Sequence, residues 1–125
     1  MLLIYLWLNA VMYLFLGAWC TVMPDKTATS IGFAFTKAGA RSEYITVYGG
    51  MEVGLGVFFM LTALNPAWRQ AGLLLGLCLY GGLALWRLYT FLTIDGVTGF
   101  PRFAFVLESV LFVAALLLVL RTRAA

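Results

Sequence analysis

The sequence predicts an all-α integral membrane protein, an up-down bundle of four helices. Three observations support this. Of the 125 residues, 64% are hydrophobic and only 10% are charged, whereas a soluble domain carries about 25% charged residues. Four stretches are apolar over the roughly 20 residues that a transmembrane helix needs. Most connections between these stretches are short, which makes consecutive helices antiparallel neighbours. We therefore expect a single transmembrane domain over residues 1–125.

The predicted spans are separated by residues that end or turn a helix. Pro24 follows the first span, Asn65-Pro66 the second and Asp95-Gly96 the third, and all three are turn or breaker signals. The first span has no Lys or Arg before it and no small-x-small cleavage site. We interpret it as a retained helix rather than a signal peptide. The four predicted spans are residues 2–23, 44–64, 69–92 and 102–120.

The longest polar segment, residues 24–43, lies between the first two spans. Its polar residues, such as Asp25 and Lys26, are mixed with the apolar Ile31 and Phe33. This mixture predicts a short interfacial helix or a loop folded onto the mouth of the bundle. Two roles stay open for it, a lipid-surface anchor and a lid over a substrate.

Charged residues near the span ends bear on orientation and partners. Four spans place both termini on one side, together with the second loop, and the positive-inside count of the two sides is nearly balanced. We expect termini in the cytoplasm and a bacterial inner-membrane location. Because the basic residues are scattered, they predict lipid contacts and not nucleic-acid binding. One side carries Arg69, Arg121 and Arg123; the other carries Lys26, Lys37, Arg41 and Arg102, with Asp25, Glu43 and Asp95.

Three charged residues lie well inside predicted spans, away from the span ends. Charges in hydrocarbon are costly, so they pair or face a wet cavity. At 1.5 Å per residue, Glu52, Arg87 and Glu108 lie ~12, ~8 and ~9 Å from the same membrane face. The planar guanidinium can bond two carboxylates. We therefore expect Arg87 to bridge Glu52 and Glu108, and we assign these three as the candidate catalytic residues.

Aromatic residues surround this predicted layer. Tyr44, Tyr48 and Glu52 fall at i, i+4 and i+8, a stripe on one helix face, although Tyr44 is also typical of an interfacial aromatic. Tyr80 shares a stripe with Arg87. Tyr13 and Trp19 of the first span are placed to close a pocket. Asp95 lies at the mouth of the layer, where a role in the turn is the simpler interpretation. The candidate ligand-binding residues are Tyr13, Trp19, Tyr48, Tyr80 and Asp95.

Small residues and cysteines give weaker signals. Gly50-xxx-Gly54 and Gly72-xxx-Gly76 are patterns that let membrane helices approach closely. Cys20 and Cys78 differ in predicted depth by ~16 Å. This exceeds the Cα distance of about 7 Å that a disulfide tolerates, so we predict two free thiols. The chain has no histidine, which excludes His-based metal sites and Ser-His pairs. We expect no metal and no cofactor.

Several of these residues together resemble a known family. Arg41, the run from Tyr48 to Phe58 (YGGMEVGLGVF), Arg87, Asp95-Gly96 and Glu108 resemble the domain of unknown function 4345 family, which is grouped with the DoxX-like four-helix membrane proteins. The resemblance covers most of the chain and implies a membrane four-helix fold, but the family has no settled activity. Some DoxX-like relatives are linked to sulfur or quinone redox chemistry, and this chain lacks a CxxC pair. More distantly, the architecture looks like sterol-isomerase-type membrane bundles.

Three interpretations of the buried polar group stay open. In the first, the group is a structural network that fixes helix register. In the second, it is the site of a membrane enzyme or binder, whose ligand is a lipophilic molecule (an isoprenoid, sterol, quinone or acyl chain), isomerised or cyclised by metal-free acid/base chemistry. In the third, the chain is an accessory or assembly subunit of a larger membrane complex or homo-oligomer. A lipid-accessible cavity touching Glu52 favours the second interpretation, and a solid core the third.

Overall fold

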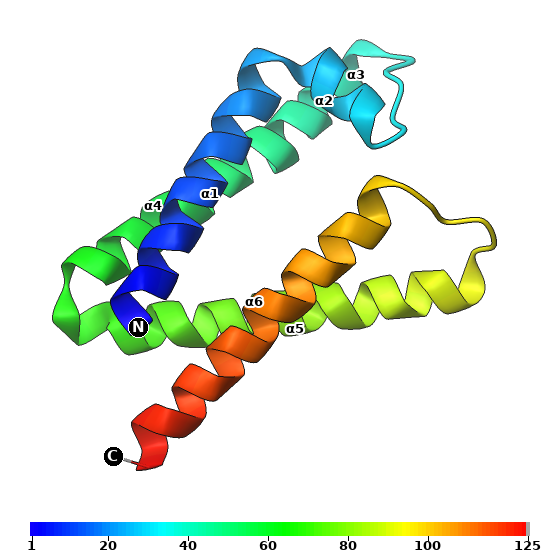
Figure 1. Cartoon of the computed structure of the whole chain (residues 1–125). Coiled ribbons are helices and arrows are strands. Elements are labelled where there is room, and N and C mark those ends of the chain that lie inside the picture. Colours follow the sequence, from blue (N-terminus) through cyan, green and yellow to red (C-terminus); the bar gives the residue numbers. More distant parts are fainter. Residues whose placement is uncertain (125) are drawn as a thin grey trace.

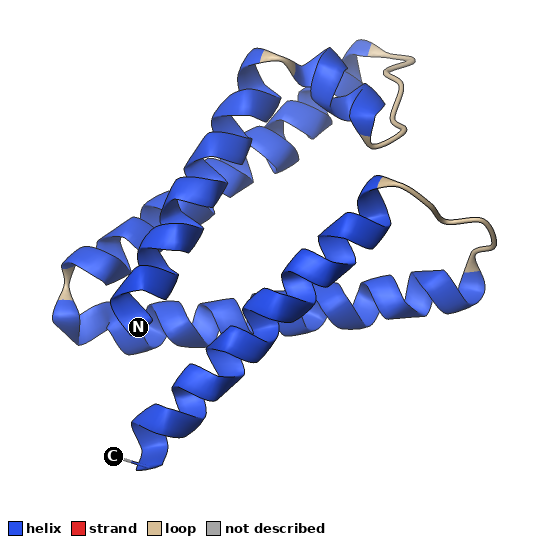
Figure 2. Cartoon of the chain, in the orientation of Figure 1, coloured by secondary structure: helices blue, strands red, loops and turns tan. Residues whose placement is uncertain are grey.

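The computed structural model describes the backbone of residues 1–124 and the side chains of residues 1–122, and this part of the chain contains helices and no strand (Figure 2). The prediction of an all-α fold is confirmed. In chain order the elements are α1 (Leu2–Val22), α2 (Pro24–Ser30), α3 (Ala38–Tyr44), the π-helical η1 (Ile45–Met51), α4 (Glu52–Leu64), the 3₁₀ turn η2 (Pro66–Trp68), α5 (Arg69–Thr93) and α6 (Phe100–Ala124).

Four helices are long and apolar enough to cross a membrane. Because α3, η1 and α4 follow one another without a break, they form a single helix, Ala38–Leu64, and this helix is the second span. The other spans are α1, the segment Pro66–Thr93 and the segment Phe100–Thr122. The chain is thus a membrane protein with transmembrane helices. The second span begins at Ala38 and not at Tyr44 as predicted, because residues 38–43 continue the helix.

Local sequence explains where the helices end. Pro24 begins α2, a position that needs no backbone N–H donor. Asn65 caps η2, because its side-chain oxygen accepts a hydrogen bond from the Ala67 backbone nitrogen at 3.1 Å. Gly96 and Gly99 have φ of +76° and +73°. This left-handed region is open to glycine at little cost, and it makes the turn from α5 into α6.

The helices form two hairpins. In Figure 1, α1 runs beside α4, and α5 and α6 cross each other; α1 also packs on η1. Both termini lie at the same end of the molecule as the α4–α5 turn, while α2, α3 and the α5–α6 loop lie at the opposite end (Figure 1). The four spans therefore alternate in direction, as an up-down arrangement requires.

One core joins the two hairpins at the terminal end. It contains Tyr5, Leu6, Ala10, Tyr13, Phe59, Ala63, Leu73, Tyr80, Leu111, Ala115 and Val119. The remaining surface of the spans carries many exposed large apolar side chains, for example Leu85 and Phe103, at 64% and 65% exposure. Such a surface suits a lipid environment and would be a liability in water.

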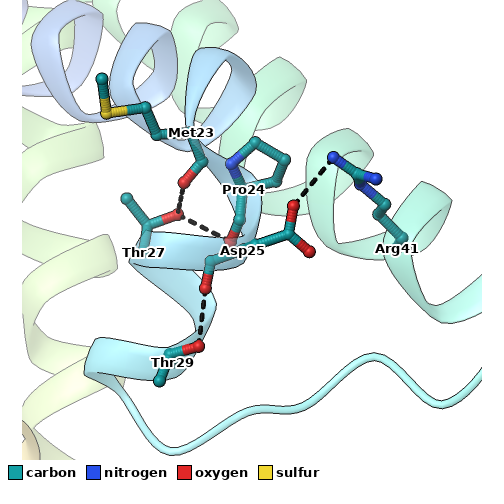
Figure 3. Close-up of polar contacts among 6 residues, drawn as sticks. All are labelled: Met23, Pro24, Asp25, Thr27, Thr29 and Arg41. Carbon is teal, nitrogen blue, oxygen red and sulfur yellow. Dashed lines mark hydrogen bonds and ion pairs between the residues drawn. The ribbon is translucent and has the colours of Figure 1, made fainter.

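A compact cap covers the end of the first hairpin opposite the termini. Arg41 of α3 pairs with Asp25 of α2, with 2.9 Å between Nη2 and Oδ2. The Thr27 hydroxyl donates to the backbone oxygens of Met23 and Pro24, and the Thr29 hydroxyl donates to that of Asp25 (Figure 3). These bonds stabilise the short helix α2, which agrees with the expectation of a short helix in the first loop.

Candidate functional site

An ion pair inside the bundle joins α5 to α6. Arg87 Nε lies 2.5 Å from Glu108 Oε2, and Arg87 Nη2 lies 2.9 Å from Glu108 Oε1. The pair is bidentate, the geometry in which a guanidinium and a carboxylate bond most strongly. The exposed fractions of the two side chains are 27% and 10%. The predicted partnership of Arg87 with Glu108 is therefore present.

Glu52 occupies a different position. It begins α4 immediately after η1, and its side chain is half-buried. Its Oε2 atom is buried and has no hydrogen-bond partner among the described residues. A buried polar atom without a partner is uncommon and needs an explanation. Glu52 also directly follows a π-helical segment, and such segments occur frequently at functional sites.

The prediction that Arg87 bridges both glutamates is wrong, because among the described side chains Arg87 pairs with Glu108 alone. There are two physical reasons. The predicted depth of Glu52 was counted from Tyr44, but the helix begins at Ala38, which adds six residues, or ~9 Å. In addition, the second span packs mainly on α1, whereas the arginine lies in the hairpin of α5 and α6.

An aromatic and amide network connects α1 to α5 between these groups. Tyr13 stacks on Phe59 and Tyr80, with ring centroids 5.9 and 6.5 Å apart. The Tyr80 hydroxyl donates to Asn9 Oδ1, and Asn9 Nδ2 donates to the Tyr5 carbonyl oxygen at 2.8 Å. Asn9, Tyr13 and Tyr80 are all buried.

Tyr13 lies on the stretch of α1 that packs against the start of α4. There a Cβ on Gly17 would meet Val53, and a Cβ on Gly56 would meet Leu14. This contact brings the part of α1 that carries Tyr13 to the part of α4 that carries Glu52. Among the predicted ligand-binding residues, the structure brings Tyr13 and Tyr80 together.

Asn9 is the residue that sequence reasoning undervalued. Its amide is fully buried and joins α1 to Tyr80 of α5. The signal was available, since Tyr5, Asn9 and Tyr13 fall at i, i+4 and i+8. That spacing places all three on one face of a helix.

Tyr48 lies in a second aromatic cluster, beneath the cap. It stacks on Tyr44, with ring centroids 4.6 Å apart, and packs edge-on against Phe33. Tyr44 is 5% exposed, and its hydroxyl lies 3.8 Å from the Cys20 sulfur. The cap covers Tyr44, and its position at the membrane interface stays a prediction. Tyr48 is one turn from Glu52, so this cluster adjoins the site from the cap side.

Trp19 and Asp95 are not part of the group. Trp19 is 40% exposed and packs against Phe15, on the outward face of α1. This face points away from the core residues Tyr13 and Gly17. Asp95 is exposed in the turn between α5 and α6. The prediction that Trp19 closes a pocket is therefore wrong. Asp95 lies in the turn, which agrees with the simpler of its two interpretations.

The structure also places the cysteines and two cavities. Cys20 is buried, Cys78 is exposed, and both are free thiols. A cavity of about 330 Å³ lies between the N-terminal end of α1 and α6, and one of about 290 Å³ lies beside Arg41 at the cap. Neither is lined by Glu52, Arg87 or Glu108. Among the described residues, no group of three or more Cys, Asp or Glu side chains is arranged to hold a metal ion.

Fold and site together define a class, a small four-span membrane protein with an ion pair and an unpaired carboxyl between its helices. The chain belongs to the family described as a domain of unknown function, DUF4345, whose sequence profile matches residues 1–119. Comparison with curated proteins and with solved structures gave no match. The predicted family membership is thereby confirmed.

Proposed function

We propose that the protein binds a lipophilic small molecule beside Glu52 and moves a proton on it, isomerising or cyclising an isoprenoid, sterol, quinone or acyl chain. The observation that supports this most is the contrast between the two glutamates. Glu108 is held by Arg87 in a bidentate ion pair, while the buried Oε2 of Glu52 has no partner. Two carboxyl groups in unlike environments can take the two unlike roles of acid/base chemistry.

Glu52 is the proton carrier in this proposal. An unpaired carboxylate is costly in hydrocarbon, which suits this side chain to hold a proton and release it only to a bound molecule. Protonation of a carbon–carbon double bond forms a C–H bond and a carbocation. Loss of a proton from the adjacent carbon to Glu52 then restores the acid and moves the double bond. Atoms balance without any other reactant.

The remaining side chains of the site hold the helices around Glu52 in place. The Arg87–Glu108 pair holds α5 against α6 and keeps its own charges compensated, so it does not compete for the transferred proton. The stacked rings of Tyr13 and Tyr80 hold α1 against α5. The tyrosines of the second aromatic cluster, Tyr44 and Tyr48, border the site on the other side.

Deuterium labelling tests the proposal. The purified protein, reconstituted in bilayers in D₂O, is incubated with a panel of unsaturated isoprenoids, sterols and acyl chains. Proton transfer through Glu52 labels the substrate at the carbons flanking the double bond, which mass spectrometry detects. Glu52→Gln should abolish labelling and keep the fold. Glu43→Gln, which removes an exposed carboxylate in the same long helix, should label as the parent does.

The alternative, an accessory subunit of a larger complex, is supported by the absence of Glu52 from the lining of both described cavities, and it makes the opposite forecast. No panel member would be labelled, Glu52→Gln would be silent, and the chain would purify with a larger membrane partner.

We further propose that the protein resides in a bacterial inner membrane with both termini in the cytoplasm. Arg69 and Arg121 lie at the terminal end. Because the count of basic residues at the two ends is nearly balanced, cysteine labelling is the test of this orientation. A kinship with DoxX-like proteins stays a prediction.

A further inference from the structure

An apolar groove separate from the candidate site lies at the terminal end of the bundle. Ile4 and Tyr5 line it from α1, and Ala114, Leu117 and Leu118 line it from α6. Its volume of about 330 Å³ falls at the lower end of the range for small-molecule sites. The groove is therefore large enough to hold part of a ligand.

The groove exists because α6 packs mainly on α5 and only briefly on α1. Toward its C-terminal end α6 runs free of α1 (Figure 1), which leaves Ile4 and Leu117 at 72% and 53% exposure. The Tyr5 hydroxyl donates to the Leu111 carbonyl oxygen at 3.4 Å and closes the inner end. From Ala114 to Arg121 the groove extends ~10 Å along the helix.

Arg121 stands at the open end of the groove. Residues 109–120 carry no charge, so Arg121 is the first charged residue of α6 after Glu108 and lies where the apolar part of the span ends. Its Nη1 donates to the Met1 sulfur at 3.3 Å, which is a neutral and weak acceptor. Among the described residues no acidic side chain pairs with it. A guanidinium with no acidic partner among the described residues thus stands at the end of the apolar groove, where the apolar part of the span ends.

We propose that this groove holds an acyl chain of an anionic phospholipid from the surrounding bilayer, with the lipid phosphate at Arg121. The apolar lining fits a hydrocarbon chain, and the guanidinium fits phosphate oxygens in charge and in donor geometry. Basic pockets between transmembrane helices bind anionic lipid headgroups by the same chemistry. The charge of Arg121 selects the headgroup, and the groove supplies the contact with the chain.

Native mass spectrometry of the full chain in detergent tests the proposal. Phosphatidylglycerol and phosphatidylcholine with identical acyl chains are added in turn, and the bound fraction is measured. The parent should prefer phosphatidylglycerol by about fivefold, the size expected for one basic residue at an anionic membrane surface. Arg121→Gln should abolish the preference, and Arg121→Lys should keep most of it. Raising the salt concentration should weaken it.

Two control variants, Lys26→Gln and Val110→Leu, distinguish binding in this groove from non-specific electrostatic attraction and from non-specific hydrophobic binding. Lys26→Gln removes one exposed positive charge at the other end of the bundle and should leave the preference unchanged. Ala114→Leu fills the groove and should lower the binding of both lipids. Val110→Leu adds one methylene at an exposed position of the same helix and should change neither.

Three results overturn the proposal. The first is equal binding of the two lipids by the parent chain. The second is a preference that survives Arg121→Gln. The third is a chain dimer that Ala114→Leu dissociates and that phosphatidylglycerol does not displace, since the groove would then be an interface with a second copy. None of these results bears on Glu52, so the lipid site and the proposed reaction fail independently.

Discussion

At the scale of single residues, a carboxylate among apolar helices is stable only when something replaces water. Glu108 has Arg87 for this purpose, with two hydrogen bonds in a fixed plane. Glu52 has no partner for its buried oxygen. The sequence predicted the Arg87–Glu108 pair from the cost of unpaired charge. It could not predict which glutamate stays unpaired, because that depends on where a helix begins and how two hairpins diverge.

Removing Arg87 should be the most damaging single change to the ion pair. Arg87→Ala leaves the carboxylate of Glu108 buried without a partner, and breaking a buried pair typically costs about 3–5 kcal/mol. Thermal unfolding in detergent should show a large fall in midpoint. The double variant Arg87→Met with Glu108→Leu removes both charges and should recover much of the loss. Equal loss in the single and double variants would show that packing, and not charge, holds α5 to α6.

Glu52→Gln should have almost no effect on the unfolding midpoint. The structure gives Glu52 no partner to lose, and a neutral amide is less costly than a charge in hydrocarbon. The matched comparison is Glu108→Gln, which weakens the bidentate pair and should lower the midpoint. A stability loss from Glu52→Gln as large as that from Glu108→Gln would contradict the assignment of Glu52 as a proton carrier.

The buried amide of Asn9 offers a third residue-level test. Asn9→Leu leaves the hydroxyl of Tyr80 without its acceptor, and a stranded buried polar group costs about 1–3 kcal/mol. The double variant Asn9→Leu with Tyr80→Phe removes both partners and should be closer to the parent. The free energies of unfolding of the parent, of Asn9→Leu, of Tyr80→Phe and of the double variant together give the coupling energy between the two residues. A coupling near zero would mean that the hydrogen bond adds nothing to stability.

At the scale of elements, glycine patterns predicted helix contacts only in part. Gly72 and Gly76 do face close neighbours, Thr62 and Tyr5. Gly50 and Gly54 face open space, so the prediction that this pair packs against a helix is wrong. The contact of the second span with α1 runs instead through other glycines, Gly49 and Gly56, against Gly17 and Leu14. A glycine-xxx-glycine spacing does not say which face of a helix is buried.

Gly54 and Gly56 make a matched pair for testing this contact. A Cβ on Gly56 would lie 2.8 Å from the backbone nitrogen of Leu14, and a Cβ on Gly54 would meet nothing within 4 Å. Gly56→Ala must push α4 away from α1 and should cost about 1–3 kcal/mol. Gly54→Ala should be neutral or stabilising by up to about 1 kcal/mol, since alanine favours helix. Unfolding midpoints that rank the other way would place a different face of α4 against α1.

At the scale of the whole molecule, composition and breaker residues were sufficient to predict four membrane helices. Hydrophobicity decides that part of the fold, and Pro24, Asn65 and Gly96 mark the turns. The packing of hairpin against hairpin was not predictable in the same way, because almost every face of these spans is apolar. The divergence that separates Glu52 from Arg87 comes from which side chains interdigitate, and a count of residues from a span end does not contain that information.

Orientation in the membrane can be tested with single cysteines. Cys20→Ala and Cys78→Ala remove the native thiols, and Thr122→Cys and Thr98→Cys each add one thiol at opposite ends of the molecule. A membrane-impermeant maleimide applied to spheroplasts should label Thr98→Cys at once and Thr122→Cys only after the membrane is opened. The reverse pattern would place the termini outside the cytoplasm.

The π-helical segment before Glu52 lets the chain lose a residue there without moving that carboxyl. A π segment behaves as an α-helix with extra residue content in each turn. If one residue were deleted within Ile45–Met51 and the segment relaxed into ordinary α-helix, the remaining residues would turn through ~600°, which is close to what the longer π segment covers. Glu52 would then keep its direction. Relatives that are one residue shorter across this segment would carry the glutamate on the same face of an unbroken α-helix.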